Sequence, residues 1–207
     1  MADSIRIALI DDDEAVLDSL KLYLERQGVR TMCFSAAAAF LGVKDIAGAF
    51  DCVVADVRMP GLSGLDLVRQ LAAKGLITPV VLITGHGDID MAVSAIKIGV
   101  FDFIEKPFDE KRLLDSIHAA IGHGRRKQNE VQEFKDLKSR AAGLSKRQRQ
   151  VMELAARGLS NKEIAERLRI SPRTVEIHRA WMMERMGARN VADLVRMVMQ
   201  LEGRSLQ

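Results

Sequence analysis

The sequence predicts an α/β domain with a five-stranded parallel sheet, followed by a small all-α domain. In residues 1–121, short apolar runs rich in β-branched residues alternate with helix-like segments, the rhythm of βα units and a parallel sheet. In residues 144–207, cap residues precede successive amphipathic helical segments. Residues 122–143 between them are rich in charge and poor in apolar side chains, which predicts a domain boundary.

Local signals define each element of the first domain. The predicted strands are the apolar runs "IRIALI" (5–10), "RTMCF" (30–34), "CVVA" (52–55), "VVLI" (80–83) and "FI" (103–104). The predicted helices between and after them are Glu14–Gln27, Ala36–Leu41, Leu65–Lys74, Ile89–Ile98 and Glu110–Ile121. Gly28, Gly75 and Gly99 stand where three of these helices should stop.

Composition excludes several classes of protein. A hydrophobic content of 48% and a charged content of 29% over 207 residues are ordinary for a soluble globular protein. The chain has no apolar run of about 18 residues and no signal-peptide order, so we expect a cytoplasmic protein without a membrane span. Cys33 and Cys52 lack metal-ligand spacing, which favours ordinary reduced thiols. No GxxxxGK[ST] or GxGxxG phosphate loop occurs, so nucleotide-driven chemistry has no support.

The net charge changes sign along the chain. Residues 1–121 hold 12 Lys/Arg and 18 Asp/Glu, a net charge of −6, whereas residues 122–207 hold 19 and 10, a net charge of +9. The two parts should therefore have different partners. The basic part could meet phosphate groups, an acidic protein or only solvent, so charge needs a motif beside it.

Polar residues follow the predicted strands at the edge of the sheet where ligands bind in open α/β domains. Asp11 and Asp12 follow the first strand, and Asp56, Thr84 and Lys106 follow the third, fourth and fifth. Carboxylate oxygens suit Mg²⁺, and Asp56 could attack a phosphoryl group while Thr84 and Lys106 hold its oxygens. The sequence therefore predicts phosphoryl transfer to Asp56.

Four motifs in the first 120 residues resemble the receiver domain of two-component response regulators, which has a flavodoxin-like fold. They are "DD" at 11–12, "DVRMPGLSG" at 56–64, "TGHGD" at 84–88 and "FIEKPF" at 103–108. His86 in the third motif is expected to lie in an exposed turn without a chemical role.

The resemblance implies a role for each matching residue. The residues implied to hold Mg²⁺ are Asp11, Asp12, Asp56 and, through its backbone carbonyl, Arg58. Asp56 would be the phosphoacceptor, and Thr84 and Lys106 would contact its phosphoryl group. Phe103 would be the switch aromatic that turns inward when Thr84 shifts, and Pro107 would follow a cis bond.

Two other functions account for part of the sequence. "DDDEA" at 11–15 nearly fits the D-x-D-x-T nucleophile motif of haloacid dehalogenase-like phosphatases, although Ala15 replaces the expected Thr or Val. Such a Mg²⁺-dependent phosphatase would turn over substrate through Asp11 and leaves Asp56 unexplained. A phosphate-sink interaction protein would show no salt-sensitive duplex binding by residues 144–207.

The charged stretch 122–143 predicts a solvated helix or a tether. Val131, Phe134 and either Leu137 or Lys138 recur in it at helical spacing, so a docking or coiled-coil stripe is possible. One stripe of this length is too short to establish dimerisation.

Cap signals divide residues 144–207 into helices with a helix-turn-helix arrangement. The N-terminal signals are the capping boxes Ser145–Gln148 and Ser160–Glu163 and the N-cap Ser171 ahead of Pro172. Gly158 and Gly187 mark helix ends, and Asn190 is a plausible cap for the last helix at 190–200.

The helix "PRTVEIHRAWMMERM" (172–186) suits the DNA major groove. Helical spacing turns Val175, Met182 and Met186 to the core and leaves another face for DNA. On that face Glu176 could accept from cytosine, and Ile177 could contact a thymine methyl group. The predicted phosphate contacts are Lys162, Arg173 and Arg179, and Thr174 belongs to the same DNA-contacting set.

"GLSNKEIAERLRISPRTVEIHR" at 158–179 resembles the LuxR-type DNA-binding domain of the NarL/FixJ family of response regulators. Two residues depart from the family pattern: Gln148 replaces a frequent Glu, and Trp181 stands where a small or polar residue is usual. By resemblance, the last helix supplies the dimer contact on DNA.

The two resemblances together imply a phosphorylation-activated transcriptional regulator that is not an enzyme. Its expected partners are a sensor histidine kinase, double-stranded DNA, RNA polymerase and, after phosphorylation, a second copy of the chain. The motifs are most similar to the FixJ branch, which implies a FixL-like kinase and control of low-oxygen or nitrogen-fixation genes. Phosphorylation could pair two receivers or release an inhibited DNA-binding domain, and the linker leaves both open.

Overall fold

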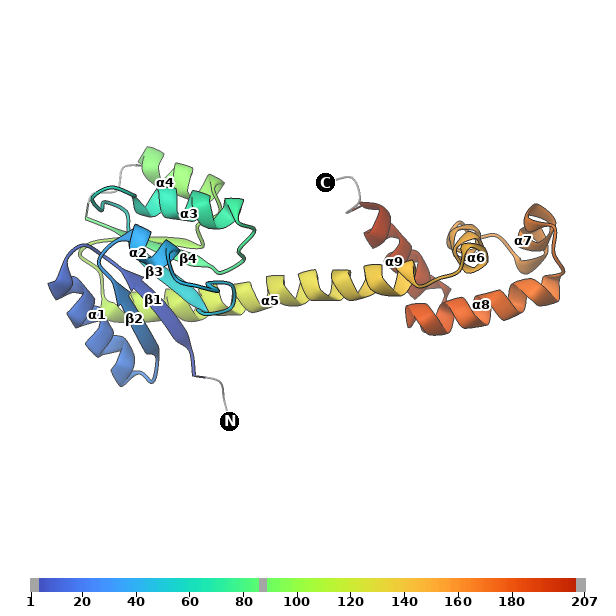
Figure 1. The fold of residues 1–207 in the computed structure, drawn as a ribbon, viewed down its shortest axis with the longest axis horizontal. Coiled ribbons are helices and arrows are strands. Elements are labelled where there is room, and N and C mark those ends of the chain that lie inside the picture. Colours follow the sequence, from blue (N-terminus) through green and yellow to red (C-terminus); the bar gives the residue numbers. More distant parts are fainter. Residues whose placement is uncertain (1–3, 86–88, 204–207) are drawn as a thin grey trace. The chain divides into compact units, whose positions relative to one another are not determined.

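The computed structural model describes residues 4–85 and 89–203 and contains a parallel sheet with helices between and after its strands (Figure 1). The strands are β1 (Arg6–Ile10), β2 (Arg30–Phe34), β3 (Cys52–Asp56), β4 (Val80–Thr84) and β5 (Asp102–Glu105). The helices are α1 (Glu14–Arg26), α2 (Ala37–Leu41), α3 (Gly64–Ala73), α4 (Ile89–Lys97), α5 (Glu110–Ala142), α6 (Lys146–Ala156), α7 (Asn161–Leu168), α8 (Pro172–Met186) and α9 (Val191–Gly203). Two compact units, residues 1–128 and 129–207, divide within α5.

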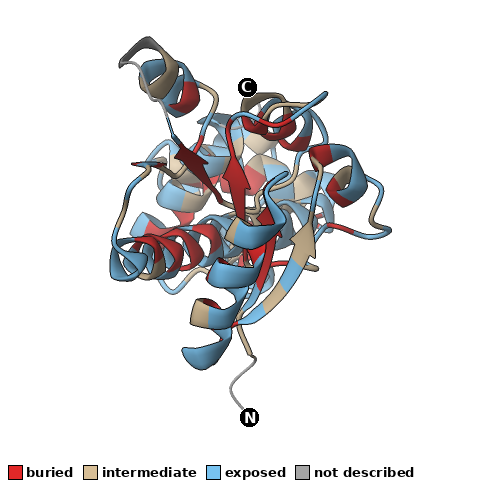
Figure 2. Ribbon diagram, turned by 90° about the vertical axis from the view of Figure 1, so that its left-hand side faces the viewer, coloured by how far each residue is buried: buried red, intermediate tan, exposed pale blue. Residues whose placement is uncertain are grey.

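The sheet confirms the predicted fold class. Its strand order is β2-β1-β3-β4-β5, and every neighbouring pair is parallel. This is the flavodoxin-like order, in which helices cover both faces of the sheet. Because both faces are covered, β3 and β4 are buried at every position, as the red central strands of Figure 2 show.

Alternate side chains of the strands enter two separate cores. Ala8 and Ile10 of β1 face the core that includes α2 and α3, whereas Ile7 and Leu9 face the core that includes α1 and the first part of α5. This two-sided burial fixes the register of the sheet, since a slip by one residue would exchange the faces. The carboxyl ends of β1, β3, β4 and β5 therefore lie along one edge.

The predicted end of a helix at Ile121 is wrong, because α5 continues without a break to Ala142. Gly122 and Gly124 weaken a helix, but the polar residues after them are mostly good helix formers. Gly124 also has a packing reason, since a Cβ there would lie 2.9 Å from Cδ of Pro79. The helix thus crosses the charged stretch 122–143.

Residues 129–207 form a helical unit with its own apolar core. Helices α5 to α9 each contribute a side chain that is no more than 3% exposed: Leu137, Val151, Ile164, Met182 and Leu194. The predicted caps form, with both capping boxes closed and Ser171 Oγ accepting from the Thr174 amide. The turn between α7 and α8 passes through Arg169 in the left-handed region (φ 53°), where glycine is more usual.

Two expectations from composition concern the thiols and the membrane. Cys33 and Cys52 are free, and burial raises the pKa of Cys52 to about 12. Among the helices that the structure describes, none is both long and apolar enough to cross a membrane.

Candidate functional site

Three of the predicted site residues meet at the carboxyl ends of the strands. Asp11 follows β1, Asp56 ends β3 and Lys106 follows β5. The Lys106 ammonium lies 2.9 Å from Oδ1 of Asp56 and 3.1 Å from Oδ2 of Asp11. Asp11 and Asp56 are 5% and 7% exposed, so this ion cluster is largely screened from water.

Backbone amides hold the two carboxylates in place. The Arg58 amide donates to Oδ2 of Asp56 at 2.6 Å, and the Asp13 amide donates to Oδ1 of Asp11 at 2.9 Å. The loop after Asp56 folds back closely, because a Cβ on Gly64 would overlap the Asp56 carbonyl oxygen. Lys106 and Pro107 are joined by a cis peptide bond, as the resemblance implied.

The remaining predicted receiver residues lie at the ends of β1 and β4 and within β5. Thr84 ends β4 and is fully buried, one position beyond Ile83, which is the register partner of Asp56. Phe103 of β5 is half-buried against the core under α3 and α4. Asp12 is exposed in the turn after β1. His86 lies outside the described residues.

The electrostatics of the cluster favour a bound cation. Burial raises the pKa of Asp11, and the Asp13 amide and Lys106 partly oppose this rise. Burial lowers the pKa of Lys106, but its hydrogen bonds to Asp56 and Asp11 outweigh burial, so the pKa is raised. One ammonium thus faces two carboxylates, and the site keeps an excess of negative charge when all three are ionised.

The donor atoms fit Mg²⁺ rather than a metal that needs many side chains. In the described part of the chain, no three His, Cys, Asp or Glu side chains are grouped as a metal site. Mg²⁺ is commonly held by one or two carboxylates together with water and substrate phosphate oxygens. Asp11 and Asp56 meet this requirement.

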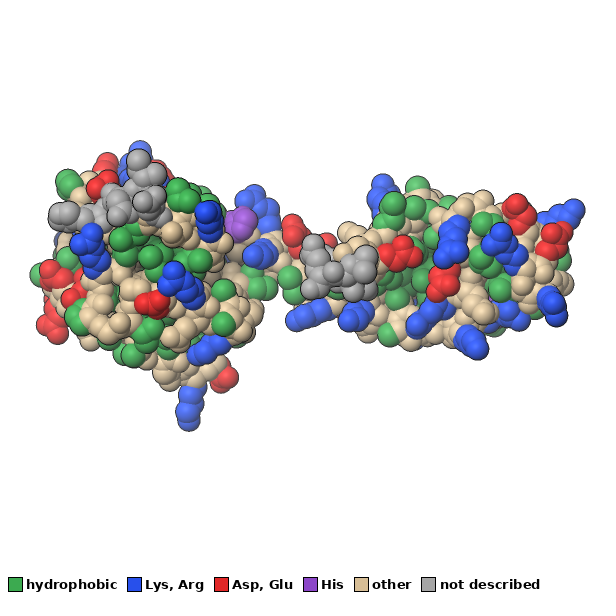
Figure 3. Space-filling view, turned by 90° about the horizontal axis from the view of Figure 1, so that it is seen from above, with side chains coloured by type: hydrophobic (Ala, Val, Ile, Leu, Met, Phe, Trp, Pro, Cys, Tyr) green, Lys and Arg blue, Asp and Glu red, His purple; other side chains and the backbone are tan. Residues whose placement is uncertain are grey.

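The predicted DNA-contacting residues lie on α7 and α8, and their side chains are exposed or half-buried. Val175, Met182 and Met186 are fully buried as expected, whereas Ile177 is 42% exposed. Trp181, one turn further on, is 57% exposed. Lys and Arg side chains lie over the visible face of this unit, interspersed with Asp and Glu (Figure 3).

Several of these side chains already have intramolecular partners. Arg173 Nη1 lies 3.1 Å from Oε2 of Glu176, so DNA would have to compete with this exposed ion pair. The Thr174 hydroxyl lies 2.8 Å from the Ser171 hydroxyl. Lys162 is exposed on α7, as a phosphate contact requires. The remaining member of the predicted set is Arg179.

Arg179 shows a role that local pattern could not reveal. It is half-buried, and its Nη1 donates to Oδ1 of Asn161 at 2.8 Å, which ties α8 to the start of α7. Asn161 stands 18 residues away in sequence and follows no recognisable motif with Arg179. Nδ1 of His178 is buried without a hydrogen-bond partner among the described residues, and its ring contacts Trp181 edge to face.

Comparisons with known proteins identify both units. Residues 7–118 match the response regulator receiver domain, and residues 142–198 match the bacterial regulatory proteins of the luxR family. The chain belongs to the response regulators that join a receiver to a LuxR-type helix-turn-helix domain, the NarL/FixJ family. It is a phosphorylation-activated transcriptional regulator, and this finding favours the first interpretation over a phosphatase or a phosphate sink.

Individual relatives match over nearly the whole chain. The transcriptional regulatory protein FixJ of Azorhizobium caulinodans is 44% identical over 96% of this chain and 94% of its own. The C4-dicarboxylate transport transcriptional regulatory protein DctR of Rhodobacter capsulatus is 42% identical over 94% of this chain and 99% of its own. The solved structure of the response regulator StyR superimposes with a TM-score of 0.80 at 36% identity, covering 94% of this chain and 98% of that one.

Proposed function

We propose that Asp56 accepts a phosphoryl group from the phosphohistidine of a sensor kinase. A carboxylate oxygen of Asp56 attacks phosphorus, the P–O bond forms as the P–N bond breaks, and the electron pair stays on the imidazole nitrogen. The observation that carries this proposal is the ion cluster of Asp11, Asp56 and Lys106 at the ligand-binding edge of the sheet. A FixL-like kinase is the proposed donor, on the strength of the motif resemblance.

Lys106 is proposed to follow the charge when Asp56 is modified. Its ammonium now pairs with both carboxylates, and a phosphoryl group on Asp56 would offer it oxygens with more negative charge. The Thr84 hydroxyl, at the end of β4, is proposed to donate to a phosphoryl oxygen. Phe103 would then turn further into the core, which would alter the surface over β5.

Mg²⁺ is proposed as the cofactor of this transfer, held by Asp11, Asp12, Asp56 and the Arg58 carbonyl. When bound, it supplies positive charge that offsets the repulsion between the carboxylates and the incoming phosphoryl group. The chain's own amides keep the carboxylates in position, since the Arg58 and Asp13 amides each occupy one oxygen.

The output of the protein is proposed to be sequence-specific DNA binding by α8. Glu176 and Ile177 are the proposed base-reading residues, because both side chains are exposed on α8, whereas Val175 is buried. The proposed phosphate contacts are Lys162, Arg173 and Arg179, with Thr174 at the start of the helix. Lys162 is exposed, whereas Arg179 would have to leave or share its hydrogen bond with Asn161 in order to contact a phosphate.

Pairing of two phosphorylated chains is proposed as the route to tighter DNA binding. Val93 and Ile96 on α4 are 43% and 69% exposed, which supplies apolar surface for such pairing. Two basic units would then contact the two halves of a site, and contact with RNA polymerase in the cytoplasm would follow. The regulated genes are proposed by resemblance alone to serve low-oxygen metabolism or nitrogen fixation.

Acetyl phosphate labelling followed by intact-mass measurement tests the phosphoacceptor. The wild-type chain should gain one phosphoryl group in Mg²⁺, and Asp56→Asn should gain none because the isosteric amide is not a nucleophile. Asp18→Asn on the exposed face of α1 is the matched control and should label as wild type. Specific labelling of the Asp56→Asn chain elsewhere would contradict the assignment.

A further inference from the structure

The end of α5 is packed as part of the helical unit. Leu137 is 3% exposed and belongs to the same apolar core as Met182 and Met186 of α8. Ala141, one turn later, also packs against this core. Both residues precede the region that matches the luxR family, which begins at 142. The DNA-binding unit of this protein therefore uses a helix segment that lies ahead of the region matched to the luxR family.

An arginine from this segment closes the C-terminal end of α8. Helix ends carry carbonyl groups without intrahelical partners and a partial negative charge. Nη1 of Arg140 donates to the Met186 carbonyl at 2.7 Å. Gly187, in the left-handed conformation (φ +71°), leaves room for the guanidinium, since a Cβ there would lie 2.7 Å from Nη1. The charged donor thus sits where the helix needs one.

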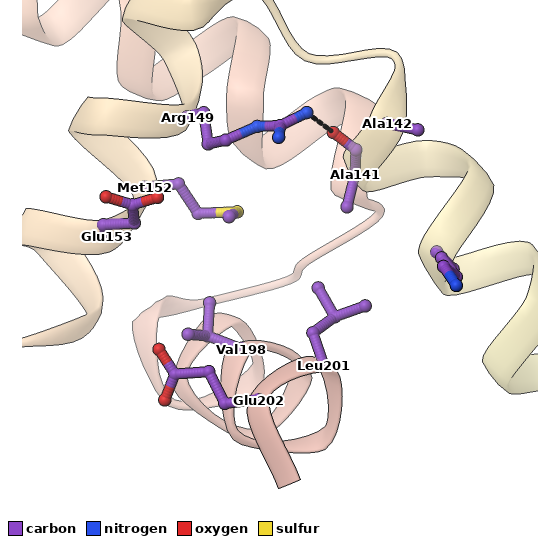
Figure 4. Close-up of a pocket in the computed structure, with 9 residues that line it drawn as sticks. Ala141, Ala142, Arg149, Met152, Glu153, Val198, Leu201 and Glu202 are labelled. Atoms are coloured by element: carbon purple, nitrogen blue, oxygen red, sulfur yellow. Dashed lines mark hydrogen bonds between the residues drawn. The ribbon is translucent and has the colours of Figure 1, made fainter. Parts of the chain in front are cut away.

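The C-terminal end of α5 is covered in the same way. Nη2 of Arg149 on α6 donates to the Ala141 carbonyl at 3.3 Å, the dashed contact in Figure 4. The guanidinium of Arg185 on α8 lies over Gly143, where a Cβ would overlap it. Helices α5 and α8 therefore each place an arginine against the end of the other.

Side-chain packing is incomplete on one side of the region where the end of α5 meets α6 and α9. A pocket of about 570 Å³ opens between α5, α6 and α9, with Met152, Val198 and Leu201 pointing into it (Figure 4). Ala141 and Ala142 border it with small side chains only. Because packing is thin on this side, the attachment of α5 depends on Leu137 and on the arginine contacts.

We propose that residues 129–142 act as the first helix of the DNA-binding unit, and that Arg140 is a positioning residue that holds α8 in its DNA-reading orientation. The inference rests on the proposed role of α8 in reading DNA. Since α5 is one helix from Glu110 to Ala142, the segment that leaves the receiver holds the recognition helix directly.

The test compares variants of the full chain on two duplexes, one selected from a random pool by the wild-type chain and one scrambled. Arg140→Met should weaken binding to the selected duplex about tenfold, the scale of a lost charge-assisted hydrogen bond, and should not weaken binding to the scrambled one beyond the control. The control is Lys135→Met, which removes the same charge from an exposed position on α5. Arg140→Lys should restore most of the lost preference.

Equal losses on both duplexes would show that Arg140 is only a phosphate contact, and no loss beyond the control would show that it does not position α8; either result overturns the inference. If Arg140→Met loses helicity, Arg149→Met carries the test, because it frees the end of α5 from α6 and should reduce the same preference. Ile177→Ala separates the two proposals. If Ile177→Ala leaves the preference for the selected duplex unchanged, the proposed function of α8 fails. If Ile177→Ala changes this preference while Arg140→Met binds both duplexes like the wild-type chain, only the inference about Arg140 is refuted.

Discussion

Replacing Lys106 with methionine should destabilise the receiver at neutral pH. The change removes an ammonium that lies 2.9 Å and 3.1 Å from two carboxylates that are each less than 10% exposed. Breaking a buried pair by removing one partner costs about 3–5 kcal/mol. Because the Lys106 side chain is 29% exposed, water screens part of this, and we expect a loss of about 1–3 kcal/mol.

The pH dependence of this loss follows from Asp11. Burial already raises the pKa of Asp11 above its ordinary value, and loss of Lys106 removes a group that lowers this pKa. An acid whose folded pKa is raised favours folding below its unfolded pKa, and that contribution is lost as pH rises through the folded pKa. The difference between wild type and variant should therefore be largest near neutral pH and shrink as pH falls toward 4. Mg²⁺ should also reduce it.

Urea unfolding followed by two signals isolates the effect. The only tryptophan, Trp181, reports the helical unit, and far-UV circular dichroism reports both units. Lys106→Met should shift the unfolding transition of the receiver, which circular dichroism follows and tryptophan fluorescence does not. Lys111→Met, an exposed change nearby on α5, should leave both transitions in place. An unchanged receiver transition at pH 7, or a loss of stability that grows on acidification, would contradict a stabilising role of Lys106 between the two carboxylates.

Three further predictions concern the fold and the DNA-reading face. Gly64→Ala should cost the receiver at least about 2 kcal/mol in urea unfolding, since its Cβ would overlap the Asp56 carbonyl, whereas Gly122→Ala in open helix should stabilise by about 0.5–1 kcal/mol; equal effects would contradict the packing. Arg173→Ala should weaken DNA binding on all sequences and lower the salt slope by about one, so an unchanged slope would remove the phosphate role. Ile177→Ala should alter base preference in a selection experiment, and an unaltered consensus would exclude it from base reading.

The receiver fold and its site could be largely predicted from sequence because both follow short-range rules. Apolar runs reveal buried parallel strands, and the carboxyl ends of such strands share one edge, so Asp11, Asp56 and Lys106 could be brought together despite wide separation. The capping boxes at Ser145 and Ser160 each join two residues that are three positions apart, so they could also be predicted from the sequence.

The errors and omissions all involve contacts between distant residues. The helix that begins at Glu110 was predicted to end at Ile121, yet α5 continues to Ala142, and the small size of Gly124 lets it approach Pro79. The sequence shows Leu137 only as part of a short apolar stripe, whereas the structure places it in the apolar core with Met182. The contact of Arg140 with the end of α8 spans 46 residues and has no local signature.

The most direct test of the account is a DNA titration of the full chain with and without beryllium fluoride and Mg²⁺, using the selected duplex at fixed salt. Beryllium fluoride mimics the phosphoryl group on Asp56, so we expect tighter binding by the wild-type chain and no change for Asp56→Asn. Equal affinity of the wild-type chain in both conditions, or the same gain in the Asp56→Asn chain, would contradict the claim that Asp56 controls DNA binding.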